Sequence, residues 1–277
     1  MASFLGIPYA VPPTGPLRWK PPKPFYLKDR EFAATTESPI CPQFGYPFNT
    51  TLNESEDCLY LNIYTKHFSP RSRKPVLFWI HGGSLIFGSA YMYKAQNLAK
   101  ELDVVVVSIN YRLNAFGFLA LRELNWGDPR RVSGNYGIMD QQLALSWVRE
   151  NIAAFGGDPH RVTLLGQSSG GTSIYALMSS PASRGLFHAA IAMSGSANIT
   201  MGFPEVNKQN RAFLSASSCD NLAGKETLEC IYGLTTAEVL QATPGVYNFI
   251  PLAYPFPSDK RAGMQYPGVV YVDGVTV

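Results

Sequence analysis

RVTLLGQSSGG, residues 161–171, is the stretch from which the fold of the whole chain can be predicted. Its apolar run at 162–165 predicts a buried strand, and the residues TSIYALMSS at 172–180 predict a helix that ends before Pro181. A glycine-rich turn that joins a strand directly to a helix is the setting in which the pattern G-x-S-x-G exposes a nucleophilic serine. The stretch therefore predicts both a fold class and a type of chemistry.

The pattern assigns the nucleophile to Ser168. Gly166 and Gly170 flank this serine at the required spacing, and the strained turn needs small residues at both positions. Ser169 is the poorer candidate, because in its register the first glycine would be Gln167. The alternative is an ordinary glycine turn, but the strand before it and the helix after it favour the nucleophile.

Composition indicates a compact globular protein. Of the 277 residues, 46% are hydrophobic and 16% are charged, which suits a sizeable core. The net charge of +3 is too small to predict a nucleic-acid partner. No apolar run approaches the roughly 18 residues that a membrane helix needs, and the first residues lack the features of a signal peptide.

Other apolar runs extend the alternation of strands and helices. Further strands are predicted at 59–65, 76–80, 104–109 and 188–193. Helices are predicted at 93–102 and, most clearly, at 138–155, where apolar residues recur with the 3.6-residue helical period. This alternation predicts the α/β class, with a mostly parallel central sheet covered by helices on both faces.

The two ends of the chain differ from the middle. Residues 1–25 contain seven prolines, which exclude a regular helix and predict an extended segment lying on the body of the protein. Beyond residue 205 the pattern is helical and more polar, and Thr235–Glu238 is a capping box that opens a short helix. Residues 243–277 show no strong period.

A second glycine turn, His81–Gly82–Gly83, follows the predicted strand at 76–80. Acyl transfer through a serine needs N–H donors that hold the negative oxygen of the tetrahedral intermediate. We expect the backbone amides of Gly82 and Gly83, with that of Ser169, to supply them. The alternative is a turn that merely leaves a strand, and the presence of two such turns after two buried strands argues against it.

The chain contains no convincing catalytic histidine. In this class the order along the chain is serine, acid, histidine. Only His188 follows Ser168, and it lies 20 residues further on, without room for an intervening acid. We expect His67 and His160 to be surface or capping residues, and His81 belongs to the glycine turn.

Cysteines and glycosylation sequons point to the secretory pathway. The cysteines are Cys41, Cys58, Cys219 and Cys230, and their spacing alone does not choose among three pairings. Sequons begin at Asn49, Asn53 and Asn198, and two of them lie between the first two cysteines. A disulfide-bonded, glycosylated loop would need an oxidising compartment, although no signal peptide opens the chain.

Two charged residues interrupt apolar surroundings. Arg112 follows the strand at 104–109, and Asp140 lies at the start of the helix at 138–155. We expect them to pair across the contact between helix and sheet, because an unpaired charge buried there would be costly. The alternative is that both are solvated.

Six motifs together resemble the type-B carboxylesterase and cholinesterase family of α/β-hydrolases. They are FLGIPYAVPPTGPLRWKPP at 4–22, EDCLYLNIYT at 56–65, VLFWIHGGS at 76–84, NYRLNAFGFL at 110–119, GNYGIMDQQLALSWVRENIAAFGGDP at 134–159 and VTLLGQSSGG at 162–171. The resemblance runs almost end to end and implies one partial α/β-hydrolase domain over 1–277. Its C-terminal half, with the triad acid and histidine, would lie outside the chain.

The resemblance implies a role for each of several residues. Ser168 would be the nucleophile of a carboxylic ester hydrolase that forms an acyl-enzyme, and Ser194 would lie near the triad acid. The implied oxyanion hole is Gly82, Gly83 and Ser169. The implied pairs are the disulfides Cys41–Cys58 and Cys219–Cys230 and the salt bridges Arg18–Glu56 and Arg112–Asp140. The implied substrate is a small carboxylic ester, with no metal or organic cofactor.

Departures from the family pattern refine this expectation. Gln167 stands where many members have Glu, and no Trp lies between the first two cysteines, where cholinesterases place a choline-stacking Trp. The chain ends in YVDGVTV at 271–277, which resembles a segment midway along the family, and it lacks the family's first strands and signal peptide. We expect the N-terminal half of a secreted carboxylesterase, inactive alone. One alternative is a non-catalytic adhesion protein of the same fold. A stable, non-catalytic short isoform is a weaker one, because a sheet cut after the strand at 188–193 would leave an apolar edge.

Overall fold

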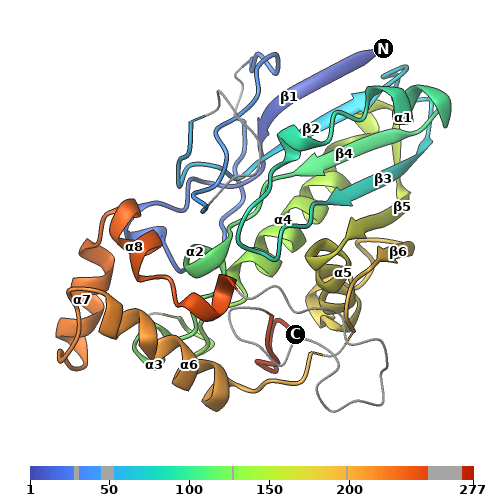
Figure 1. Cartoon of the computed structure of the whole chain (residues 1–277). Coiled ribbons are helices and arrows are strands. Elements are labelled where there is room, and N and C mark those ends of the chain that lie inside the picture. The colour runs from blue at the N-terminus through green and yellow to red at the C-terminus, as the bar shows by residue number, and fades with distance from the viewer. Residues whose placement is uncertain (28–30, 45–52, 127, 198, 249–269) are drawn as a thin grey trace.

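A six-stranded mixed sheet forms the centre of the part of the chain described here, residues 1–27, 31–44, 53–126, 128–197, 199–248 and 270–277 of a computed structural model (Figure 1). The strand order is β1-β2-β4-β3-β5-β6. The strands are β1 (Ala2–Pro8), β2 (Tyr60–Thr65), β3 (Lys74–Ile80), β4 (Val105–Ile109), β5 (Gly157–Gln167) and β6 (Ala189–Met193).

The strands β4, β3, β5 and β6 are parallel to one another, whereas β2 is antiparallel to both of its neighbours, β1 and β4. Parallel neighbours need crossover connections, which are usually helical. Here they contain α1 (Gln96–Glu101), α4 (Tyr136–Asn151) and α5 (Ser169–Ser179). The predicted α/β class is therefore confirmed, and the mostly parallel sheet has an antiparallel margin.

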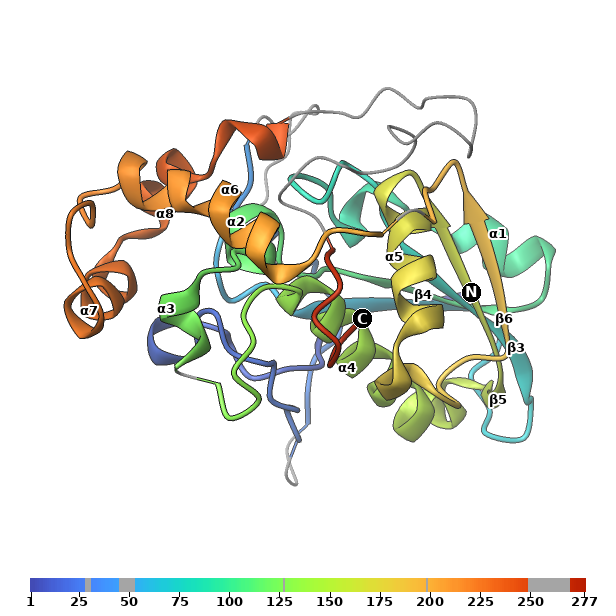
Figure 2. The ribbon, with the colours of Figure 1, turned by 90° about the horizontal axis from the view of Figure 1, so that it is seen from below.

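Helices cover both faces of the sheet. In β4, Val107 packs in the main core with Leu145 of α4 and Ile174 of α5. Its neighbour Val106 belongs to a separate cluster with Ala99 of α1. Because successive strand residues point to opposite faces, α1 lies on one face and α4 and α5 lie on the other (Figure 2). None of the helices in the described ranges is both long and apolar enough to cross a bilayer.

A second group of helices stands to one side of the sheet (Figure 1). It contains α6 (Phe203–Ala216), α7 (Lys225–Gly233) and α8 (Thr236–Ala242), which pack against the segment that follows β4. That segment contains α2 (Asn114–Phe118) and α3 (Arg122–Asn125). We call α6, α7 and α8 the helical layer. The short 3-10 helices are η1 (Gly15–Leu17), η2 (Ala90–Met92), η3 (Ile152–Phe155), η4 (Pro181–Ser183) and η5 (Gly245–Asn248).

The structure corrects several boundaries of the predicted elements. The proline-rich start contains a strand, β1, which a bulge between Phe4 and Ile7 interrupts. Pro8 is the last residue of β1, which is the end strand of the described sheet, and an edge strand tolerates a missing N–H. The predicted helix at 138–155 is an α-helix only to Asn151, after which η3 completes it. At the other margin, β6 pairs only with β5 among the described strands, and Ile191 is 49% exposed.

Candidate active site

Ser168 forms the joint between the end of β5 and the first residue of α5. Its backbone has φ 57° and ψ −125°, a strained conformation for a residue with a side chain. Such a conformation costs about 1–3 kcal/mol and persists only where the surroundings impose it. Here the Ser168 amide donates to the Met193 carbonyl at 2.8 Å. A Cβ at Gly166 would lie 2.6 Å from the Gly170 carbonyl oxygen, so the turn requires the glycine.

The second glycine turn lies directly against this joint. A Cβ on Gly82 would approach the Gln167 carbonyl oxygen to 2.6 Å and the Ser168 Cβ to 3.1 Å, so only glycine fits. Gly83 has φ 109°, and a Cβ there would overlap the carbonyl oxygen of Phe87. Among the described residues, no hydrogen bond is donated by the amides of Gly82, Gly83 or Ser169. Within the described ranges, the three predicted donors are therefore left without protein acceptors.

The backbone after these glycines is held in an unusual shape. We call residues 82–88 the glycine loop. Ser84 and Leu85 have φ values of 54° and 61°, although both have side chains and Leu85 is fully buried. The Leu85 amide donates to the Ser169 hydroxyl at 3.2 Å. At the far end, buried Gln43 accepts from the Gly88 amide at 2.8 Å and donates to its carbonyl at 3.2 Å. The sequence offered no signal for Gln43.

His81 is a buried support of the glycine loop. Its Nδ1 lies 2.8 Å from the Gly82 carbonyl, which accepts, and its ring stacks on Tyr111 with 4.4 Å between centroids. Burial lowers the pKa of His81 to about 4, against a smaller opposing effect of this hydrogen bond, so the ring is neutral at physiological pH. The Tyr111 hydroxyl donates to the His81 carbonyl at 2.7 Å. Sequence reasoning missed Tyr111.

Two of the histidines, His160 and His188, lie together and far from Ser168. The Nδ1 of His188 accepts from the Val162 amide at 3.3 Å, and the His188 and His160 rings meet edge to face at 6.3 Å. His160 precedes Ser168 by eight residues along β5, a distance of roughly 26 Å in an extended strand. The histidine pair therefore lies at the opposite end of the strands from the joint.

Ser194 lies at the same strand ends as Ser168. It follows β6, whose last residue, Met193, is in register with Gln167 of β5. Ser194 is exposed and has φ 52°. Its expected proximity to a triad acid stays a prediction, because nothing in the described residues supplies that acid beside it.

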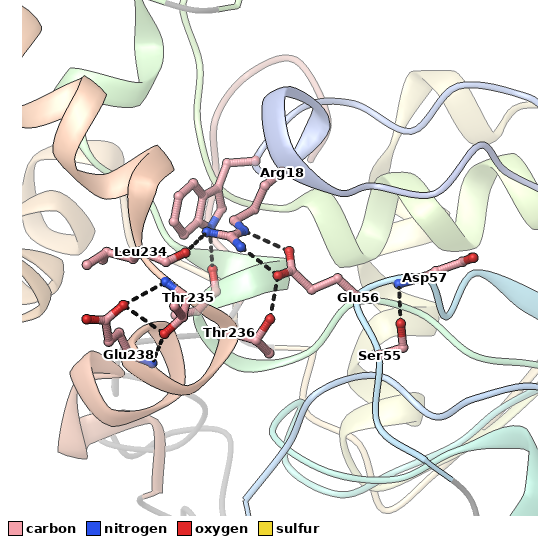
Figure 3. A network of polar contacts seen from close by, with 10 residues as sticks. Arg18, Ser55, Glu56, Asp57, Leu234, Thr235, Thr236 and Glu238 are labelled. Atoms are coloured by element: carbon pink, nitrogen blue, oxygen red, sulfur yellow. Dashed lines mark hydrogen bonds and ion pairs between the residues drawn. The ribbon is translucent and has the colours of Figure 1, made fainter.

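Both expected salt bridges are formed. Asp140 accepts from the Arg112 side chain at 2.7 and 2.8 Å, and the exposed fractions of the two side chains are 0% and 3%. Arg18 makes a similar two-point contact with Glu56 at 2.6 and 2.7 Å (Figure 3). Two disulfides are also present, Cys41–Cys58 and Cys219–Cys230. Of the three sequons, Asn53 is exposed, whereas Asn49 and Asn198 lie outside the described residues.

Arg18 and Glu56 connect three distant segments. Figure 3 shows the Arg18 guanidinium between the Glu56 carboxylate and the Leu234 carbonyl, to which Nη1 donates at 2.6 Å. The Thr236 hydroxyl donates to Glu56 at 2.7 Å. The capping box at Thr235 is formed as predicted, with its side chain accepting from the amide three residues on. The start of α8 is thus fastened to the N-terminal segment.

A cavity of about 590 Å³ lies away from Ser168. It is bordered by β1, residues 24–27, Phe32, Ala34 and the C-terminal half of α4, and aromatic side chains such as Phe4 and Trp147 line it. Neither the serine joint nor the glycine loop contributes to its walls. The cavity therefore adds nothing to the geometry around Ser168.

A mixed sheet with a parallel centre, helices on both faces and a serine on a strained strand-to-helix joint define an α/β-hydrolase. Residues 1–265 match the pattern of the Carboxylesterase family. The chain belongs to that family, in agreement with the resemblance of its six motifs.

Individual relatives show how far the similarity extends. The chain is 40% identical to human "Cocaine esterase" over 99% of this chain and 51% of that protein. It is 44% identical to "Para-nitrobenzyl esterase" of Bacillus subtilis (strain 168) over 76% of this chain and 43% of that protein. The solved structure titled "PNB ESTERASE" superposes with a TM-score of 0.77 at 40% identity, over 87% of this chain and 49% of that one. The chain thus spans about half the length of these relatives.

Proposed function

We propose that Ser168 is the nucleophile of a carboxylic ester hydrolase. The observation that supports this most strongly is the contact between the two glycine turns, where three amides donate no hydrogen bond to any described residue. Such donors stabilise an oxyanion and have no comparable use in a protein that only binds partners. A non-catalytic adhesion protein is therefore the less favoured alternative, and the named relatives above are esterases.

In the proposed reaction, the Ser168 oxygen attacks the carbonyl carbon of the ester while a base takes its proton. The carbonyl oxygen becomes negative and accepts hydrogen bonds from the amides of Gly82, Gly83 and Ser169. Collapse of the intermediate expels the alcohol and leaves an acyl-serine, which water then hydrolyses. Each donor contributes about 2.7–4 kcal/mol to lowering the barrier, by analogy with other oxyanion holes.

The proposed substrates are small carboxylic esters without a choline group. The absence of a Trp between Cys41 and Cys58 disfavours choline esters, as set out for the sequence. The two disulfides and the exposed sequon at Asn53 favour an oxidising, secretory compartment as the place of action.

Hydrolysis of p-nitrophenyl acetate by the natural protein that contains this chain tests the proposal. Ser168→Ala should reduce the rate to the spontaneous level. Gly83→Ala should also lower it, because a Cβ there displaces the loop. Hydrolysis that survives Ser168→Ala would contradict the assignment of the nucleophile.

Residues 1–277 alone should show no turnover above background. Loss of the triad histidine costs on the order of a million-fold in the subtilisin example. Among the described residues, the ring hydrogen bonds of His81 and His188 are to the Gly82 carbonyl and the Val162 amide. Ser168-dependent turnover by this chain would mean that it supplies its own base, which would contradict the expectation that the base lies elsewhere.

A further inference from the structure

Two buried hydrogen bonds lie beneath the glycine loop. The Leu85 amide donates to the Ser169 hydroxyl at 3.2 Å. The Tyr111 phenol donates to the His81 carbonyl at 2.7 Å. Ser169 is 4% exposed, and Leu85, Tyr111 and His81 are fully buried. The first bond joins the start of α5 to the middle of the loop, and the second holds the residue that precedes the loop.

The chemistry of these groups sets the direction of the hydrogen bonds. Burial raises the pKa of the Tyr111 phenol far above its ordinary value, with a smaller lowering effect from Ser169, so the phenol stays protonated. A protonated phenol donates its single proton to the His81 carbonyl. The Ser169 hydroxyl accepts from the Leu85 amide, which has its N–H as the only group to donate.

The glycine loop needs such support because its backbone is strained in the middle. Ser84 and Leu85 are consecutive residues with side chains in the left-handed region. Strained residues persist only where neighbouring groups fix them. Gln43 holds the far end at Gly88, and the Asn114 amide donates to the Leu85 carbonyl at 2.7 Å. Within the described structure, the hydroxyl of Ser169 is the group that ties the middle of the loop to the helix bearing the serine joint.

We propose that Ser169 is a positioning residue, whose hydroxyl sets the amides of Gly82 and Gly83 at the correct place relative to Ser168. This rests on the proposed function, in which those amides hold the oxyanion. Ser169 would then act twice, through its own amide and through its side chain. A substitution by Ala keeps the amide and removes only the side-chain tie, so the two roles are separable.

Steady-state kinetics of p-nitrophenyl acetate hydrolysis by the natural protein that contains this chain test the proposal. Ser169→Ala should lower kcat by about 10–100-fold, as expected for slightly misplaced catalytic groups, while KM changes by less than about threefold. Ser169→Thr retains the hydroxyl and should restore kcat to within about threefold of the wild type. Ser173→Ala is the matched control, because this buried hydroxyl on the same helix accepts from Gln141 at 3.2 Å instead.

A role confined to stability would lower the unfolding temperature of Ser169→Ala and leave kcat unchanged for the folded protein. That result would overturn the proposal, as would a Thr variant as slow as the Ala variant. If Ser169→Thr does not fold, exchange of the Leu85 amide in Ser169→Ala decides the question, because it reports the side-chain bond directly.

Amide hydrogen exchange in residues 1–277 separates this inference from the proposed function. Ser169→Ala should speed exchange of the Leu85 amide roughly tenfold, and Ser173→Ala should not. Unchanged exchange would overturn the inference even in an active enzyme. Faster exchange, found together with a natural protein that shows no Ser168-dependent hydrolysis, would support the side-chain tie and refute the esterase function.

Discussion

The sheet with its serine joint and the helical layer hold their shapes by different means. Around the joint, backbone packs directly on backbone, and glycines such as Gly82 and Gly166 make room for it. The helical layer has three short helices, one disulfide and a polar attachment through Arg18 and Glu56. Each region depends on an arginine–carboxylate pair. The Arg112–Asp140 pair is buried inside the sheet region, whereas the Arg18–Glu56 pair joins the helical layer to the N-terminal segment. The difference predicts global consequences for damage to the first region and local ones for the second.

The largest effect should come from the buried Arg112–Asp140 pair. Asp140→Asn keeps the shape of the side chain but leaves the Arg112 charge buried without its counter-charge. Such a loss costs about 3–5 kcal/mol of the free energy of unfolding. Chemical denaturation should report it as one global transition at lower denaturant. Glu229→Gln is the control, because its pair with Lys225 is exposed and should contribute little. Equal midpoints for Asp140→Asn and wild type would contradict the contrast.

Acid should weaken the sheet region through His81. Its pKa is about 4 when folded and 6.5 when unfolded, so between these values the unfolded state binds the extra proton. The free energy of unfolding should therefore fall by about 3 kcal/mol from pH 7 to pH 4 through this group. His81→Asn cannot titrate and should show a shallower acid loss. If the free energy of unfolding falls equally with pH in both proteins, His81 is not the cause of the acid loss.

Damage to the Arg18–Glu56 pair should be smaller and local. Glu56→Gln removes the negative charge that accepts hydrogen bonds from Arg18 and Thr236. The free energy of unfolding should fall by about 2 kcal/mol. The amides of α8 should exchange faster, while those of α5 keep their protection, as hydrogen-exchange mass spectrometry can resolve. Faster exchange across both helices would mean that the helical layer and the sheet unfold as one unit.

The smallest effect should come from a single cap in the helical layer. Thr235→Ala removes the side-chain oxygen that accepts from the Glu238 amide and should cost about 1 kcal/mol. Thermal unfolding should shift slightly, and exchange should rise only in the first turn of α8. Thr235→Ser retains the acceptor and should behave like the wild type. A loss as large as that of Asp140→Asn would contradict the ranking.

Much of the fold could be predicted because its signals are local. Apolar runs located β2, β3, β4 and β6, and the helical period located α4. The strand β1 escaped because its prolines suggested only an extended segment, and pairing with β2 depends on residues about 60 positions away. The disulfide pairing and the Arg18–Glu56 contact came from family resemblance, since spacing alone left them open. The pair of Arg112 and Asp140 could be inferred because both interrupt apolar elements.

The sequence by itself determined the identity of the serine joint. The order of small residues around Ser168 specifies a strained turn between a strand and a helix, because only glycine accepts the close backbone approach there. The tertiary structure decided what surrounds that serine. The left-handed backbone at Ser84 and Leu85 and the bonds from Ser169, Tyr111 and Gln43 join segments far apart in the chain. Sequence patterns report local sterics and burial, whereas contacts between distant segments exist only once the sheet brings its strand ends together.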